Sequence, residues 1–260
     1  MLPFGSKIES LCRLQQAQLF TEELGGGIEL EMVVIPAQEK SKTYIPERSM
    51  PGRDFHSPES KILVGKYPIT QAQWKAVSCL PKFDRVLPKS PSKFKGKDLP
   101  VENISLYDAI EFCKRLSTEF KRNYRLPTES EWEYACQAGA TTKFNFGDTI
   151  SPEYANFLDG KLGSKSKSTT PVGHFPYPNL FGLYDMHGNV YEWCLEQSVD
   201  WLKIHEADIT LPAEDRQRLI GVIRGGSWRD LSVGCNSSHF RRREPEEKSD
   251  FIGFRVVCSA

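Results

Sequence analysis

The most informative part of this chain lies between the stretch Arg-Gly-Gly-Ser-Trp at residues 224–228 and the stretch Ile-Gly-Phe-Arg-Val-Val-Cys at residues 252–258. Both stretches have the character of strand anchors. The residues between them, 229–251, show neither a helical nor a strand period and read RDLSVGCNSSHFRRREPEEKSDF. A segment of this length without its own structure is usually functional or disordered, and the two anchors argue against disorder. The pattern therefore predicts a binding surface carried on a rigid frame.

Composition excludes several classes of partner. The 260 residues carry 34 basic and 34 acidic side chains, so the formal net charge is zero and nothing attracts the chain to nucleic acid or to an anionic membrane. No apolar run reaches the length of a transmembrane helix, and the first residues lack the apolar core of a signal peptide. The seven cysteines form no C-x-x-C pair, which is typical of reduced thiols. We expect a cytoplasmic protein that contacts neither nucleic acid nor membrane.

Local patterns predict an α+β chain, with two or three helices, short antiparallel strands and much irregular structure. Residues 1–27 are expected to be a lead-in, with a helix over 7–20 and a glycine break at 25–27. The alternation of Ile28, Leu30, Met32 and Val34 with polar residues predicts a half-buried strand, and residues 61–67 predict another. Residues 206–219 are a polar insertion with room for one or two exposed helical turns. The main domain is expected to span residues 28–260.

Three helix starts are marked by capping boxes, in which a hydroxyl and the side chain three residues later satisfy free backbone amides reciprocally. The glycine at position 139 is placed to end the third helix. The three pairs are Thr70 with Gln73, Ser105 with Asp108, and Thr128 with Glu131.

Four motifs in order, RLPTESEWEYACQAG (125–139), GLYDMHGNVYEWC (182–194), RGGSW (224–228) and GFRVVC (253–258), resemble the formylglycine-generating-enzyme (sulfatase-modifying factor) family. The resemblance implies a variant of the C-type lectin fold. Within that family the chain looks most like the variable proteins of bacterial, cyanobacterial-like diversity-generating retroelements. In those proteins a reverse transcriptase rewrites a segment that matches residues 224–258 here, and the lectin fold displays the altered side chains.

The resemblance also implies structural roles. Residues 224–228 and 252–258 would be sheet strands, and Trp193 and Trp228 would be core aromatics. Arg125, Glu131 and Glu133 would form structural ion pairs.

Formylglycine-generating enzymes bind copper through two cysteines, and two thiolates suit Cu(I). The second position matches Cys235 here, but the first falls on Asp230. We therefore expect no enzyme activity and no required cofactor. The alternatives are a divergent formylglycine-generating oxidase acting on a cysteine peptide, and a scaffold or sensor domain of a signalling or effector system.

The resemblance also implies a structural calcium ion, at Asn156, Asn189 and the backbone of Val190. Glu244-Pro245-Glu246 superficially resembles the calcium triplet of sugar-binding lectins, but a three-residue match within a charged run favours a solvated turn.

The expected function is non-catalytic binding of a ligand, most simply a protein, since arginine and aromatic side chains dominate interface energetics. The sequence identifies neither the ligand nor the oligomeric state. In the diversification that the resemblance implies, substitutions arise mainly at asparagine codons. Many residues of the segment can arise from such codons, whereas Glu244, Glu246, Glu247 and Lys248 cannot. The expected contact residues are Arg229, Asp230, Leu231, Val233, Asn236, Ser238, His239, Arg241, Arg243, Glu244, Glu247, Ser249, Asp250 and Phe251.

Overall fold

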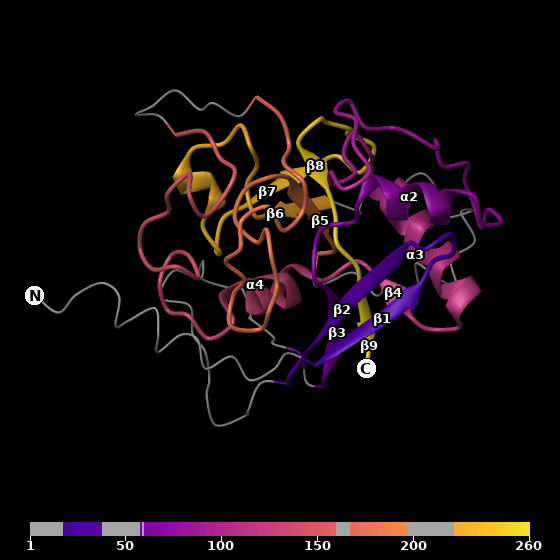
Figure 1. Cartoon of the computed structure of the whole chain (residues 1–260), viewed down its shortest axis with the longest axis horizontal. Helices are drawn as coiled ribbons and strands as arrows, with labels where there is room; N and C mark the ends of the chain where they lie inside the picture. The colour runs from indigo at the N-terminus through magenta and orange to yellow at the C-terminus, as the bar shows by residue number, and fades with distance from the viewer. Residues whose placement is uncertain (1–17, 38–57, 59, 160–166, 197–220) are drawn as a thin grey trace, which may run out of the picture.

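The computed structural model describes residues 18–37, 58, 60–159, 167–196 and 221–260, and every structural statement below concerns these residues (Figure 1). The expected helix over residues 7–20 lies mostly outside them. Its last two residues, Leu19 and Phe20, belong instead to a strand, so the helix prediction is wrong there. The expected exposed turns at 206–219 also lie outside the described residues.

The first sheet contains five strands in the order β1 (Leu19–Glu23), β2 (Glu29–Ile35), β3 (Ile62–Gly65), β9 (Val257–Ser259) and β4 (Tyr124–Arg125). All neighbours in it are antiparallel. The expected alternation of buried and exposed side chains along β2 is wrong at the end of the strand. Leu30 and Met32 are buried as expected, but Val33 and Ile35 are buried too. The reason is that β2 has a core cluster on each of its faces.

The second sheet has the order β7 (Phe240–Arg243), β6 (Gly221–Arg224), β5 (Tyr191–Cys194) and β8 (Ile252–Gly253). The pairing of β5 with β8 is parallel and the other two pairings are antiparallel. The strand expected over 224–228 ends at Arg224, because Gly225 and Gly226 adopt φ values of 94° and 74° and turn the chain. The strand expected over 252–258 is split, with residues 254–256 between β8 and β9.

Three helices pack beside the sheets: α2 (Gln71–Ser78), α3 (Leu106–Phe120) and α4 (Glu129–Gln137) (Figure 1). All three capping boxes are confirmed, with both reciprocal hydrogen bonds present at each helix start. The end of α4 differs slightly from expectation, since Ala138 already takes the left-handed conformation and Gly139 follows it.

The segment 229–251 is not irregular throughout, which corrects the sequence expectation. It contains a 3-10 turn, η1 (Ser232–Cys235), and the edge strand β7. The strand was not predictable from Phe-Arg-Arg-Arg because it carries no alternating pattern. It forms because β6 offers it a complete antiparallel partner, with Arg224 opposite Phe240 and Gly221 opposite Arg243.

The larger core cluster holds Trp74, Phe112 and Phe254 in mutual ring contact. Trp193 is fully buried in it, as expected, whereas Trp228 is only half-buried. Among the described residues, none of the helices combines the length and the apolar character needed to cross a membrane.

Candidate functional site

The expected contact residues, Asp230 excepted, have side chains at or near the surface. Arg229, Leu231, Val233 and Ser238 are exposed, and the exposed fraction of Val233 reaches 70%. We call the accessible members the display surface. They are Arg229, Leu231, Val233, Asn236, Ser238, His239, Arg241, Arg243, Glu244, Glu247, Ser249, Asp250 and Phe251.

Asp230 is the exception, because it is 8% exposed and acts as a hub beneath the display surface. Its Oδ1 accepts from the Tyr191 hydroxyl at 3.2 Å and from the Arg241 guanidinium at 2.8 Å, and its Oδ2 accepts from the Ser227 hydroxyl. Burial, reinforced by the Asp230 charge, raises the pKa of Tyr191, so its hydroxyl stays a donor. The expectation that Asp230 contacts a ligand is therefore not supported by its position.

Cys235 lies below the turn that follows β6 and is fully buried. A Cβ at Gly226 would come within 2.5 Å of its Sγ, which shows how closely the two chain segments approach. Burial and then the Asp230 charge raise the pKa of the Cys235 thiol, so it stays protonated. No cluster of three or more metal-binding His, Cys, Asp or Glu side chains occurs in the described ranges.

The part of the display surface that contains Arg229, Asp250 and Phe251 is held in place by Trp228. Its indole Nε1 donates to the Asp250 carbonyl at 3.2 Å, and the Phe94 ring meets it edge-on at 5.7 Å. The Arg229 guanidinium lies 4.8 Å from the centre of the Phe251 ring. Phe94 was missed from the sequence, because nothing local marks a loop residue that a distant segment will contact.

The charged run between β7 and β8 is held to the helical layer. Lys248 pairs with Asp108 at 2.6 Å, and Glu246 pairs with Arg85 at 3.5 Å. The Pro245 carbonyl accepts from the amide of Leu106, the first residue of α3. These contacts give the Glu244-Pro245-Glu246 triplet a structural partner, so its backbone is a fixed border of the display surface.

The residues implied for calcium do lie together, since the Asn189 amide donates to the Asn156 carbonyl at 2.8 Å. The Oδ1 of Asn189 already accepts from the Thr170 amide at 3.0 Å and from the Asn156 side chain at 3.5 Å. An ion ligated by that oxygen would have to displace these bonds. The Thr170 hydroxyl is buried without a hydrogen bond in the described part of the chain, so its oxygen is a free ligand atom beside them. Calcium at Asn156, Asn189 and Val190 stays a prediction.

The implied ion pairs are confirmed. Arg125 donates to both carboxylate oxygens of Glu131 at 2.6 Å, and Arg224 pairs with Glu133 at 2.7 Å. These pairs fix β4 and β6 against α4, below the site.

Together, the two small sheets, the three helices and the long ordered segment between β6 and β9 define a C-type-lectin-like α+β domain. The family model of the Sulfatase-modifying factor enzyme 1-like domain matches residues 27–260, so the chain belongs to that family.

Several known proteins are similar to it. The "Inactive C-alpha-formylglycine-generating enzyme 2" of Mus musculus is 33% identical over 223 residues, which cover 80% of this chain and 64% of that protein. The "Serine/threonine-protein kinase pkn1" of Chlamydia caviae is 38% identical over 61% of this chain but only 24% of its own length. The chain thus spans only part of these relatives.

Two solved structures share the fold. "Treponema denticola variable protein 1" superposes with a TM-score of 0.68 at 24% identity and covers 93% of this chain and 99% of its own. PvdO from Pseudomonas aeruginosa also gives a TM-score of 0.68 at 24% identity, over 93% of this chain and 98% of its own.

Proposed function

We propose that this chain is a non-catalytic ligand-binding domain, the variable protein of a diversity-generating retroelement, and that its ligand is a protein. One observation carries the proposal: the side chains of the display surface are accessible while the backbone beneath them is fixed. Residues 240–243 are fixed by pairing with β6, and η1 is fixed by the buried Gly234 and Cys235.

The physical consequence is pre-organisation. A surface whose backbone is already ordered loses little conformational entropy on binding, so substitutions on it change the partner without refolding the domain. Leu231 and Val233 supply exposed apolar groups, and Arg229 supplies a cation over an aromatic ring. Arginine and aromatic groups of this kind are frequent in the energetic centres of interfaces.

The replacement of the first copper-binding cysteine supports a non-catalytic role. Asp230 stands at that position with both its carboxylate oxygens engaged by neighbouring side chains, and Cys235 keeps a protonated thiol. A single buried thiol cannot supply the two thiolates that a Cu(I) site of this kind uses. The alternative of a divergent oxidase therefore rests on Cys235 alone.

The alternative of a scaffold or sensor domain is favoured by a different observation. The kinases that match this chain are about four times longer than the matched part, so a domain of this kind is part of a larger signalling protein there. A binding surface would serve a variable binding protein as well as a scaffold or sensor domain. The two roles differ in which protein modules accompany the domain.

Two matched libraries test the proposal. The first randomises Arg229, Leu231, Val233, Ser238 and Arg241. The second randomises five exposed positions on β1, α2 and α3, namely Leu19, Thr21, Glu23, Lys75 and Glu119. We expect most members of both libraries to fold, and selection against a panel of folded proteins to enrich binders mainly from the first.

Equal enrichment from both libraries would remove the special role of the display surface. The encoding locus gives an independent test: a near-copy of the codons for residues 224–258, differing mainly at adenines beside a reverse transcriptase gene, is expected. Copper-dependent oxidation of a cysteine peptide by the purified chain would instead establish the enzyme alternative.

A further inference from the structure

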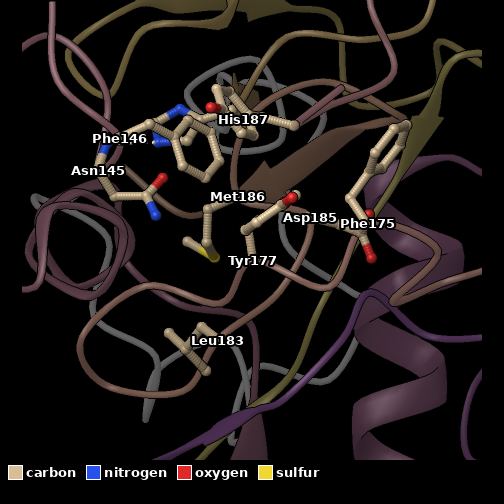
Figure 2. A pocket seen from close by; sticks show the side chains of 9 residues that line it. Asn145, Phe146, Phe175, Tyr177, Leu183, Asp185, Met186 and His187 are labelled. Carbon is tan, nitrogen blue, oxygen red and sulfur yellow. Dashed lines mark hydrogen bonds between the residues drawn. The ribbon is translucent and has the colours of Figure 1, made fainter. Parts of the chain in front are cut away.

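A hollow lies beside Cys235, whose carbonyl is hydrogen-bonded to the lining residue His187. The empty space in it and at its open mouth, which includes open solvent, is about 270 Å³. Figure 2 shows Asn145 and Phe146 on one side of it and Asp185 and Phe175 on the other. Its wall is completed by Tyr154, Tyr177, Leu183, Met186 and His187.

Four aromatic rings contribute to this wall. Phe146 stacks on Tyr154 at 5.3 Å between ring centres, and Tyr177 meets Tyr154 edge-on at 4.9 Å. Tyr177 is nearly half exposed at 46%. Rings of this kind bind a cation at their faces when it comes within about 6 Å of the ring centre.

The described residues that line the hollow include a negative charge but no lysine or arginine to balance it. Among its nine lining residues, all in the described part of the chain, Asp185 supplies a carboxylate and there is no lysine or arginine. Its Oδ2 accepts from the Gly173 amide at 2.7 Å. Burial raises the pKa of Asp185 to about 6, so a bound cation would favour its charged form.

His187 does not offset this charge. Its Nε2 accepts from the Asn145 amide at 3.1 Å, so the proton lies on Nδ1, which donates to the Cys235 carbonyl at 2.8 Å. Burial lowers the pKa of His187 to about 4, so the ring is neutral at physiological pH.

One acceptor is left over in the wall. The side-chain oxygen of Asn145 is buried and has no hydrogen-bond partner among the described residues. A buried acceptor without a partner costs free energy, and a donor in the hollow would recover it. The hollow has closed room for a group about the size of one water molecule.

We propose that this hollow binds a primary ammonium group at the Asp185 carboxylate, with the Asn145 side-chain oxygen as a further acceptor of the wall and the aromatic rings around it. An ammonium group has three donors, one positive charge and about the size of a water molecule, so it matches each of these features. Quaternary ammonium groups are too large for the closed space of the hollow. The group can come from a free amine or from the lysine of a partner protein.

The test is a titration of the full chain with ethylammonium chloride at constant ionic strength, followed by two-dimensional amide NMR. Ethanol is the uncharged control of similar shape. We expect saturable shifts at the amides of Asn145 and Gly173 with a Kd of roughly millimolar, as suits so small a ligand. Ethanol is expected to produce no saturable shift at these amides.

Two variants make the test specific. Asp185→Asn keeps the left-handed backbone at φ 55°, which asparagine tolerates, and keeps an acceptor for Gly173. It removes the charge and is expected to raise the Kd at least about tenfold. Asn145→Leu retains the volume, removes the unpartnered acceptor and is expected to weaken binding by a smaller factor. Should Asp185→Asn fail to fold, Asn145→Leu still decides the matter.

The source of the ammonium group is distinguished by N-acetyl-lysine methylamide and its Nε-acetylated form. Saturable shifts with the first and none with the second support a partner lysine, whereas shifts with ethylammonium alone support a small free amine. Equal shifts with ethanol, no saturation with ethylammonium, or an unchanged Kd in both variants would overturn the proposal.

Discussion

Glu192 and Arg255 form a bidentate ion pair that joins the two sheets. The Arg255 Nε lies 2.6 Å from Oε2 of Glu192, and its Nη2 lies 2.7 Å from Oε1. The same guanidinium donates to the Gly65 carbonyl at the end of β3, and Glu192 also accepts from the Trp132 indole at 2.6 Å. Both side chains are completely or almost completely buried. A single ion pair thus connects β5, β3 and α4.

Arg255→Met is expected to lower the free energy of unfolding by about 3–5 kcal/mol, because it leaves the Glu192 carboxylate buried without its counter-charge. The double variant Glu192→Leu with Arg255→Met is expected to recover part of this loss. Urea denaturation measures both. A loss below about 1 kcal/mol in the single variant would show that water reaches Glu192.

Asp230→Ala is expected to destabilise the domain by about 2–3 kcal/mol, because it leaves the buried donors of Tyr191 and Ser227 without their acceptor. The neighbouring substitution Arg229→Ala is the control. Its side chain is 54% exposed, so its effect should stay within about 0.5 kcal/mol. Similar unfolding midpoints for the two variants would show that Asp230 is a surface contact residue after all.

Gly226→Ala is expected to be far more damaging than Gly26→Ala. Both glycines have positive φ, 74° and 62°, so both variants carry the left-handed backbone cost of about 1 kcal/mol. A Cβ at Gly26 meets nothing within 4 Å, whereas at Gly226 it meets Cys235 Sγ at 2.5 Å and the Gly234 carbonyl at 2.7 Å. The difference between the two midpoints therefore measures the close approach alone. Equal effects would mean that η1 moves away freely.

Glu102→Gln is expected to change how stability depends on pH. Burial raises the pKa of Glu102 to about 7 from an ordinary value of 4.5, and its Oε2 has no partner among the described residues. The folded state then holds the extra proton between these values, so the wild type loses stability as pH rises from about 4.5 to 7. Glutamine cannot lose a proton. The stability of the variant relative to the wild type should rise by about 1–2 kcal/mol across this window, after allowance for solvent screening.

Urea denaturation at pH 5 and pH 8 measures this difference. The wild-type curve also contains His187, whose pKa is lowered by burial to about 4, so its contribution is lost as pH falls from 6.5 to 4. Both proteins carry that histidine, and subtraction removes it. Parallel curves for the two proteins would place the Glu102 carboxyl in contact with water.

Features that depend on neighbours along the chain were predictable from the sequence. The three capping boxes located α2, α3 and α4 within a residue, because a hydroxyl and its partner three residues later act on the nearest backbone amides only. The ordered motifs indicated the family and its fold. The Arg125–Glu131 pair also followed, since both residues belong to one short motif.

Features that depend on distant neighbours were not predictable. β7 exists because β6 lies beside it, and Phe94 borders the display surface because the chain returns to Trp228 from more than a hundred residues away. Asp185 and Asn145 are adjacent to the same hollow without any shared motif.

Motif order and local hydrogen bonds made the family, the helix starts and the place of the segment proposed as a binding surface predictable without the structure. The burial of Asp230 beneath that segment, and the hollow that Asp185 and Asn145 both line, became visible in the packed chain alone. Burial and charge pairing are set by what packs against a residue, and that neighbour is often far away along the chain.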